Sequence, residues 1–197
     1  SGVNLDHYIV RPYKEDDGVH FAFIGRVMRE KGIEEYLEAA HALKKEYSNI
    51  YFHVYGFCEE AYEDRLKKLQ EQGVIQYHGM VKDMAEVFET INCSVLPSYH
   101  EGMANSLLEA AASGRPVIAS NITGCRETFD EGVSGFGFQV KDSRALIGAL
   151  RKFLSLTTEE RQQMGLAGRK KVETEFDRNI VINAYINEIE HISKGVK

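Results

Sequence analysis

Short apolar runs alternate with stretches of helical periodicity along most of this chain. The runs have the composition of buried parallel strands, and they occupy residues 19–24, 50–55, 74–78, 94–96, 117–120 and 136–140. The stretches between them place apolar side chains at helical spacing, at residues 32–47, 60–72, 83–90 and 105–113. Strands that alternate with helices wind a parallel sheet through right-handed crossovers. We therefore predict an α/β fold with helices on both faces of a parallel sheet.

The pattern indicates one domain with a polar segment before it and helices after it. A chain of 197 residues is long enough for one α/β domain with a substantial core. Residues 1–18 are polar and include Pro12, so we expect a connector or the start of the domain there. Residues 19–156 contain the predicted sheet. Thr157 followed by Glu160 is typical of a capping box, and we expect residues 157–197 to form helices that pack on the domain.

Charge and cysteine content exclude several classes of protein. The net charge of −6 argues against a nucleic-acid partner, because binding to a phosphate backbone needs a basic field. No apolar run approaches the ~20 residues that cross a bilayer, and no signal peptide is visible. We expect a cytoplasmic protein, with a position at the inner face of the membrane left open. Cys58, Cys93 and Cys125 lack metal-ligand spacing, which favours reduced thiols over a disulfide or a metal site.

Two carboxylates bracket a loop that runs into a predicted helix. Glu101 and Glu109 follow the apolar run at residues 94–96, with Asn105 as the candidate helix N-cap and Gly114 as the helix stop. The carboxyl end of a parallel strand, where a helix begins, is where α/β proteins bind anions and the sugars of nucleotides.

Three interpretations of these carboxylates are open. They can be ordinary surface groups. They can be the acid/base pair of a hydrolase, although this separation spans ~12 Å along a continuous helix and glycosidase pairs lie about 5–9.5 Å apart. They can also accept hydrogen bonds separately from hydroxyl groups, as a carboxylate does from a ribose.

Two cations follow the run at residues 19–24. Gly25 at the end of that run allows a ligand to approach the main chain. Arg26 and Lys31 then precede a predicted helix, where a guanidinium fork and an ammonium point charge can hold a phosphate. A solvated pair of surface cations is the alternative.

These segments occur with others in a fixed order along nearly the whole chain: Gly25-Arg-x4-Lys31-Gly32, Leu96-Pro-Ser-x2-Glu101-Gly-x6-Glu109-Ala, Gly114-x-Pro-Val-Ile118, Gly124-Cys-Arg-Glu127 and Gly132-x2-Gly135-x-Gly137. Together they resemble the retaining GT-B glycosyltransferases of family 4, and specifically the C-terminal half that binds the nucleotide-sugar donor. The resemblance implies a Rossmann-like parallel sheet with helices on both faces, as in the C-terminal half of a GT-B fold.

The resemblance also implies roles for matching residues. Arg26 and Lys31 would hold the donor diphosphate, Glu109 would accept hydrogen bonds from the ribose, and Glu101 would contact the donor sugar. Arg26, Lys31 and Glu101 would be the catalytic set, with no metal and no cofactor. The remaining donor contacts are implied for the strand-end glycine, the turn beside the base, the sugar-pocket loop and two amides at the helix start: Gly25, Val81, Gly102, Met103, Ala104, Asn105, Ser106 and Leu107.

Two departures from the family pattern affect what can be inferred about the substrates. Met103-Ala104 stands where many members have an aromatic residue and glycine. The sugar pocket should therefore differ in shape from that of those members, and the resemblance does not identify the donor sugar. The Gly124-Cys125-Arg126-Glu127 form resembles that of capsule and O-antigen transferases, which favours bacterial surface-polysaccharide synthesis.

The resemblance implies a retaining glycosyltransferase that transfers a hexose or N-acetylhexosamine from a UDP-sugar to a surface-polysaccharide or lipid-linked glycan. The acceptor site would belong to an N-terminal domain outside this sequence, so we expect the chain alone to be inactive. Any membrane contact would run through that domain. The alternatives are another GT-B enzyme, such as a nucleotide-sugar epimerase or a sugar phosphorylase, and a nucleotide-binding module without catalysis.

Overall fold

A parallel sheet forms the centre of the molecule, as predicted. The structure, a computed structural model, describes residues 2–194. The sheet has six strands in the order β3-β2-β1-β4-β5-β6, and each neighbouring pair is parallel. The strands are β1 (Val19–Ile24), β2 (Ile50–Tyr55), β3 (Gln76–Gly79), β4 (Cys93–Leu96), β5 (Val117–Ser120) and β6 (Gly135–Phe138).

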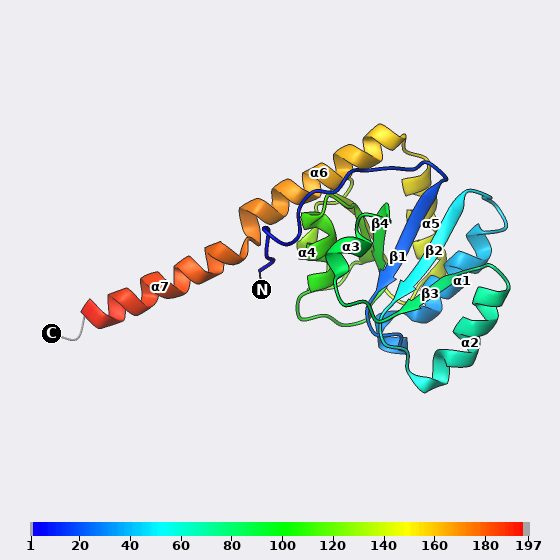
Figure 1. Ribbon diagram of the computed structural model, residues 1–197, viewed down its shortest axis with the longest axis horizontal. Helices are drawn as coiled ribbons and strands as arrows, with labels where there is room; N and C mark the ends of the chain where they lie inside the picture. Colours follow the sequence, from blue (N-terminus) through cyan, green and yellow to red (C-terminus); the bar gives the residue numbers. More distant parts are fainter. Residues whose placement is uncertain (1, 195–197) are drawn as a thin grey trace.

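Helices cover both faces of this sheet (Figure 1). Phe21 and Phe23 of β1 pack in a core shared with α1 and α5, whereas Ala22 and Ile24 pack in a second core shared with α3 and α4. Both faces of β1 are therefore buried, which is why its sequence is apolar at consecutive positions. The helices are α1 (Ile33–Leu43), α2 (Glu60–Glu71), α3 (Met84–Val87), α4 (Asn105–Ala112), α5 (Ser143–Leu154), α6 (Thr158–Glu175) and α7 (Arg178–Lys194), with short 3-10 turns η1 (Arg29–Lys31) and η2 (Arg126–Thr128).

Several helix ends differ from the predicted ones because side chains intervene. Asp83 caps α3 as predicted, accepting from the Ala85 amide at 2.9 Å. The helix ends at Val87 rather than Thr90, because the Thr90 hydroxyl donates to the Val87 carbonyl at 2.8 Å. The predicted capping box at Thr157 and Glu160 is confirmed at the start of α6.

The last two helices, α6 and α7, differ in how they contact the domain. Contacts with α4 hold α6 on the domain, whereas α7 projects away from it (Figure 1). Most side chains of α7 are exposed, including the apolar Ile182, Tyr185, Ile186 and Ile189. Within residues 2–194, no helix combines the length and apolar composition that a bilayer crossing needs.

A buried arginine ties residues 2–18 to the domain. The Arg115 guanidinium donates to the carbonyls of Phe88 at 2.6 Å and Pro12 at 2.7 Å. The Arg115 side chain also lies over the Tyr13 ring, 5.5 Å from its centre. Because backbone carbonyls satisfy this cation, the N-terminal segment is fixed beside the C-terminal ends of α3 and α4.

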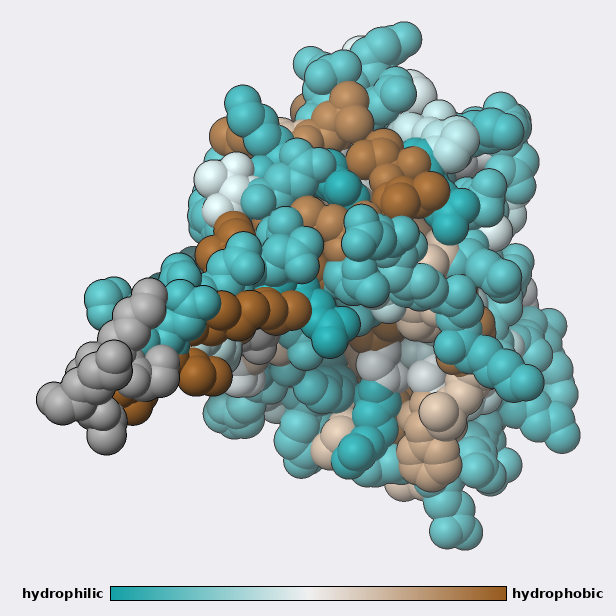
Figure 2. Space-filling model, turned by 60° about the vertical axis from the view of Figure 1, so that its left-hand side comes forward, coloured by the Kyte–Doolittle hydropathy of each residue, from teal (hydrophilic) through white to brown (hydrophobic). Residues whose placement is uncertain are grey.

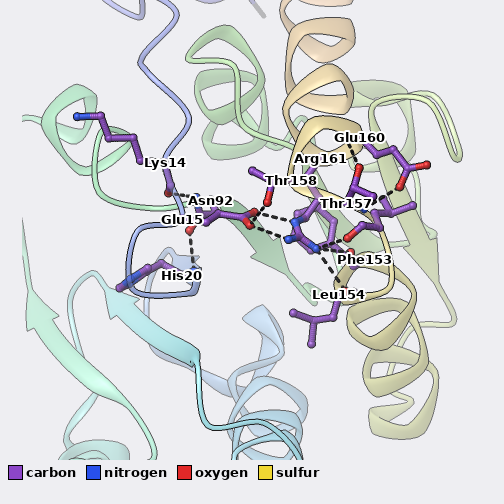
Figure 3. A network of polar contacts seen from close by, with 11 residues as sticks. Lys14, Glu15, His20, Asn92, Phe153, Leu154, Thr157, Thr158, Glu160 and Arg161 are labelled. Atoms are coloured by element: carbon purple, nitrogen blue, oxygen red, sulfur yellow. Dashed lines mark hydrogen bonds and ion pairs between the residues drawn. The ribbon is translucent and has the colours of Figure 1, made fainter.

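A buried ion pair connects the same segment to α6 (Figure 3). Arg161 donates to Glu15 through Nε at 2.7 Å and through Nη2 at 2.6 Å, and the two side chains are only 8% and 9% exposed. Arg161 also donates to the Leu156 carbonyl at 2.6 Å, and the Thr158 hydroxyl donates to Glu15 at 2.8 Å. The start of α6 and the segment before β1 therefore share one fully bonded buried pair.

Three histidines form a chain of hydrogen bonds across β1, β2 and β3. His20 Nδ1 lies 2.8 Å from His53 Nε2, and His53 Nδ1 lies 2.9 Å from His78 Nε2. Asp17 extends the chain at its other end, 2.9 Å from His20 Nε2. Burial and the neighbouring His20 and His78 lower the pKa of His53 to about 3.

This chain of histidines makes the fold sensitive to acid. Below the ordinary histidine pKa of 6.5, the unfolded chain binds a proton at position 53 that the folded protein excludes. The free energy of unfolding then falls as the pH falls from 6.5 towards 3, by at most roughly 1.4 kcal/mol per pH unit. Urea unfolding at a series of pH values measures the slope of the free energy of unfolding against pH. His53→Gln should reduce this slope, whereas His41→Gln, at an exposed position, should leave it unchanged. An unchanged slope in the first variant would contradict this account.

Candidate functional site

Three loops meet at the carboxyl edge of the sheet, following β1, β4 and β5. The first two are in main-chain contact, because the Tyr99 amide donates to the Glu30 carbonyl at 2.8 Å and a Cβ on Gly32 would lie 1.9 Å from the Pro97 carbonyl oxygen. Gly32 also has a φ of 75°, a backbone conformation that glycine adopts without strain. Glycine is therefore required where the first loop enters α1.

The second and third loops are held equally closely. The Ala104 amide donates to the Gly124 carbonyl at 2.8 Å, and the Gly124 amide donates to the Glu127 carboxylate at 2.7 Å. A Cβ on Gly124 would lie 2.5 Å from the Glu101 carbonyl oxygen, and the φ of Gly124 is 87°. The backbone at Glu101 is therefore fixed from both sides.

Lys31 and Glu101 form an ion pair between the first two loops. Lys31 Nζ lies 2.6 Å from Glu101 Oε1. The Glu101 side chain is 11% exposed and the Lys31 side chain 30% exposed, so the ammonium is the more accessible partner. An ammonium has three donors, and this contact uses one of them. Lys31 therefore keeps donors for a ligand at this edge.

Arg26 lies on the same loop without a carboxylate partner. Its side chain is exposed, and among the described residues it forms no ion pair. Gly25 precedes it, and a Cβ there would meet nothing nearer than the Phe23 ring at 3.9 Å. The space above Gly25 is therefore open, and the proposed contact of Arg26 and Lys31 with a phosphate stays a prediction.

The start of α4 differs from the prediction. Ala104 is the N-cap, and Asn105 is the first helical residue with an exposed side chain, so the prediction of an Asn105 cap is wrong. The cause is the tie between Ala104 and Gly124, which sets the chain direction one residue earlier. The Leu107 amide donates to Ala104, whereas the Ser106 amide makes no main-chain bond to a described residue. A free amide in the first turn favours an anion.

Glu109 lies on α4 beside the N-terminal segment. It is half-buried, and burial raises the pKa of its carboxyl, while a hydrogen bond from Tyr8 and the nearby His7 act in the opposite direction. Glu109 lines a cavity of about 250 Å³ with Asn4, Tyr8, Asn105 and Arg178 among its walls. Within the described residues no direct contact joins Glu109 to the Lys31–Glu101 pair.

The other predicted donor contacts have different surroundings. Gly102 is exposed, with open space at its Cβ position, whereas Ala104 and Leu107 are buried in the core beside α4. Met103 packs partly buried against the Val3–Leu108 cluster. Val81 lies after β3 at the far edge of the sheet and packs partly buried against the α3–α4 core. The proposed contacts of these residues with a donor stay predictions.

Sequence reasoning missed Asn121, Thr123 and Tyr8 near the site. Asn121 and Thr123 line a cavity of about 410 Å³ beside Glu101 together with His100 and Arg126, and the sequence signal for this cavity is the Gly124–Glu127 motif after β5. Tyr8 reaches Glu109 from a segment that is distant in sequence, and no local pattern marks it. A larger cavity of about 520 Å³, lined by Val133, Leu156 and Met164 among others, lies away from these residues.

Comparisons with known proteins agree on one class. A family model described as glycosyl transferases group 1 matches residues 9–171. The chain is 28% identical over 174 residues to the N,N'-diacetylbacillosaminyl-diphospho-undecaprenol alpha-1,3-N-acetylgalactosaminyltransferase of Campylobacter jejuni, covering 88% of this chain and 45% of that protein. It is 28% identical over 170 residues to the capsular polysaccharide biosynthesis glycosyltransferase CapM of Staphylococcus aureus, covering 84% and 44% respectively.

A solved structure matches the whole fold. HepE of Anabaena, in complex with UDP and glucose, has a TM-score of 0.80 at 18% identity, over 97% of this chain and 55% of that chain. The chain spans about half the length of each of these three proteins.

Proposed function

The chain belongs to the glycosyl transferases of group 1, and we propose on this basis that it is the half of a transferase that binds the nucleotide-sugar donor. The fold, one half of a GT-B enzyme, agrees with this proposal. The observation that carries it is the Lys31–Glu101 pair at the carboxyl edge of the sheet, close to the start of α4. An ammonium group can bind a phosphate of the donor, and a neighbouring carboxylate can accept a hydrogen bond from a sugar hydroxyl.

The proposed chemistry follows from where charge develops. The bond between the anomeric carbon and the donor phosphate oxygen breaks, and its electron pair leaves with the diphosphate, where negative charge develops. An acceptor hydroxyl bonds to the anomeric carbon and passes its proton to the departing phosphate oxygen. Lys31, Arg26 and the Ser106 amide would stabilise this charge, and Glu101 would accept from the sugar hydroxyls. Because cations of the chain serve the diphosphate, we propose that no metal is required. Retention of configuration is proposed from the motif resemblance.

The sheet order suggests how a donor would lie. The loops after β3, β2, β1 and β4 lie in that order along the carboxyl edge. We place the base beside Val81, the ribose at Glu109, the diphosphate at Arg26 and Lys31, and the sugar at Glu101. The remaining contacts of this proposal are Gly25, Gly102, Met103, Ala104, Asn105, Ser106 and Leu107.

The identities of donor and acceptor are proposed from the relatives. HepE was solved with UDP and glucose, and the Campylobacter relative is named as an N-acetylgalactosaminyltransferase acting on a diphospho-undecaprenol glycan. We propose a UDP-hexose or UDP-N-acetylhexosamine as donor and a lipid-linked or surface-polysaccharide glycan as acceptor.

The acceptor side is proposed to belong to a second half of the enzyme. Figure 2 shows apolar residues (brown) along the projecting α7. The stripe of Ile182, Tyr185, Ile186 and Ile189 recurs at helical spacing and is exposed. We propose that the other half packs on this stripe and completes the active site, so that this chain alone binds donor without turning it over.

Calorimetry with UDP, GDP and ADP tests the proposal, in buffer with and without a chelator of divalent cations. We expect weak binding that favours UDP and does not change with the chelator. Absence of heat with all three nucleotides, at protein concentrations that detect millimolar affinity, would contradict the donor-binding proposal. Product analysis of the full-length enzyme separates a transferase from an epimerase, because an epimerase needs no acceptor.

A further inference from the structure

The N-terminal segment is held firmly against the start of α4 and the junction of α6 and α7. The Val3 amide donates to the Phe176 carbonyl at 2.8 Å, and the Arg178 amide donates to the Val3 carbonyl at 3.0 Å. Arg169 of α6 donates to the Tyr8 carbonyl at 2.6 Å. The main chain at Tyr8 is therefore fixed by groups far away in sequence.

The Tyr8 ring is placed by packing, independently of its hydroxyl group. It meets Phe88 edge to face with 6.0 Å between ring centres, and the His7 ring lies 4.8 Å from it in a similar arrangement. It is partly buried between two apolar clusters. A phenylalanine would keep these contacts, so the hydroxyl group is free to serve another purpose.

Tyr8 and Glu109 line the same cavity of about 250 Å³, and the Tyr8 hydroxyl group is close enough to the Glu109 carboxylate to lower the pKa of that carboxyl. Burial and the charge of Glu109 raise the pKa of Tyr8 to about 12, so Tyr8 remains the donor at neutral pH. A carboxylate offers about four acceptor positions. One contact with Tyr8 therefore leaves enough for two ribose hydroxyl groups.

We propose that Tyr8 is a positioning residue that orients the Glu109 carboxylate towards the hydroxyl groups of a ribose, and so helps the protein to select ribonucleotide over deoxyribonucleotide donors. The inference rests on the proposed donor-binding function. Without the Tyr8 hydroxyl group, the carboxylate loses its one fixed partner on this side and can rotate. It then binds a ribose less well, whereas a ligand that lacks the 2′-hydroxyl loses less.

The same contact favours the ionised form of Glu109. Burial raises the pKa of Glu109 and the Tyr8 hydroxyl lowers it, so removal of the hydroxyl should raise that pKa further. The other charged or titratable groups around Glu109 are His7, Arg178 across the cavity, and Asp83, which is 2.9 Å from His7 Nε2. A protonated Glu109 accepts hydrogen bonds from a ribose less well, so the affinity for the donor should fall as the pH falls. In a variant without the Tyr8 hydroxyl group, this loss of affinity should begin at a higher pH.

The test is calorimetry of Tyr8→Phe with UDP and 2′-deoxy-UDP across a pH series. Tyr62→Phe is the matched control, because a glutamate, Glu34 of α1, also raises the pKa of Tyr62 on α2, away from the proposed donor site. We expect Tyr8→Phe to weaken UDP binding several-fold and to reduce the ratio of the affinities for UDP and 2′-deoxy-UDP. We also expect the pH at which UDP affinity is lost to be higher in this variant than in the wild type. The control should match the wild type. Titration of the UDP phosphate affects all variants equally and cancels in the comparison.

Three outcomes separate the possibilities. A smaller preference for UDP over 2′-deoxy-UDP, together with a loss of UDP affinity at higher pH, supports the positioning role of Tyr8. An unchanged preference and a superimposable pH profile in a well-folded Tyr8→Phe variant would overturn it while leaving donor binding intact. No binding of UDP by the wild type would overturn the proposed function and this inference with it.

Discussion

Arg161→Ala should lower the free energy of unfolding by about 3–5 kcal/mol, the cost of leaving a buried charge without its partner. Glu15, whose side chain is 9% exposed in the intact protein, would keep only the hydrogen bond from the Thr158 hydroxyl. Three carbonyls at and just beyond the end of α5 would also lose a hydrogen bond from Arg161: Phe153, Leu154 and Leu156. Urea unfolding followed by circular dichroism measures the effect.

Arg151→Ala is the matched control for this experiment. Arg151 also makes a two-point contact with a glutamate, Glu46, but the side chains are 50% and 40% exposed. Surface pairs of this kind contribute little to stability. Equal unfolding curves for the two variants would contradict the assignment of Glu15 and Arg161 as the joint between the N-terminal segment and α6. Replacing both buried partners with apolar residues should recover part of the loss.

Lys31→Ala should weaken UDP binding by about 1.5–3 kcal/mol, roughly 10-fold to 150-fold, the range of a charge-assisted hydrogen bond. The ammonium is the accessible partner of Glu101 and keeps donors for a phosphate. Its loss also leaves the Glu101 carboxylate unpaired near the diphosphate, which adds repulsion. Calorimetry on folded protein gives the affinity, and thermal unfolding confirms that the loops remain intact.

Lys44→Ala provides the comparison, since Lys44 also makes one hydrogen bond, to the Ile50 carbonyl at 3.0 Å, at the opposite edge of the sheet. It should leave UDP affinity unchanged. Arg26→Ala should weaken binding in the same direction as Lys31→Ala. If Arg26→Ala and Lys31→Ala both retain wild-type affinity, the diphosphate does not bind at these cations.

Local pattern was sufficient for most of the sheet. The bounds of β1, β2 and β5 agree with prediction because apolar runs that end at a polar or glycine residue fix both ends of a buried strand. Helix ends were harder, because they depend on contacts such as that of Thr90 with Val87 and that of Ala104 with Gly124. Asn105 satisfied the residue preference for a cap, but a tertiary bond moved the cap to Ala104.

The site was only partly predictable. Glu101 and Lys31 were each selected from sequence, yet their direct contact depends on how Gly32 and Gly124 bring three loops together. Tyr8, Arg115 and Arg161 act across long distances in sequence, so no periodicity or spacing marks them. In the sequence alone, a charged residue that tertiary contacts bury cannot be distinguished from a charged residue at the surface.

Residue-by-residue NMR during a titration with UDP tests the central claim most directly, because it reports where the nucleotide binds as well as whether it does. Donor binding at the carboxyl edge predicts amide shifts at residues 25–32, 79–81 and 101–109, with no change in the 520 Å³ cavity near Val133 and Met164. Shifts confined to that cavity, or a spectrum that UDP leaves unchanged, would contradict the claim.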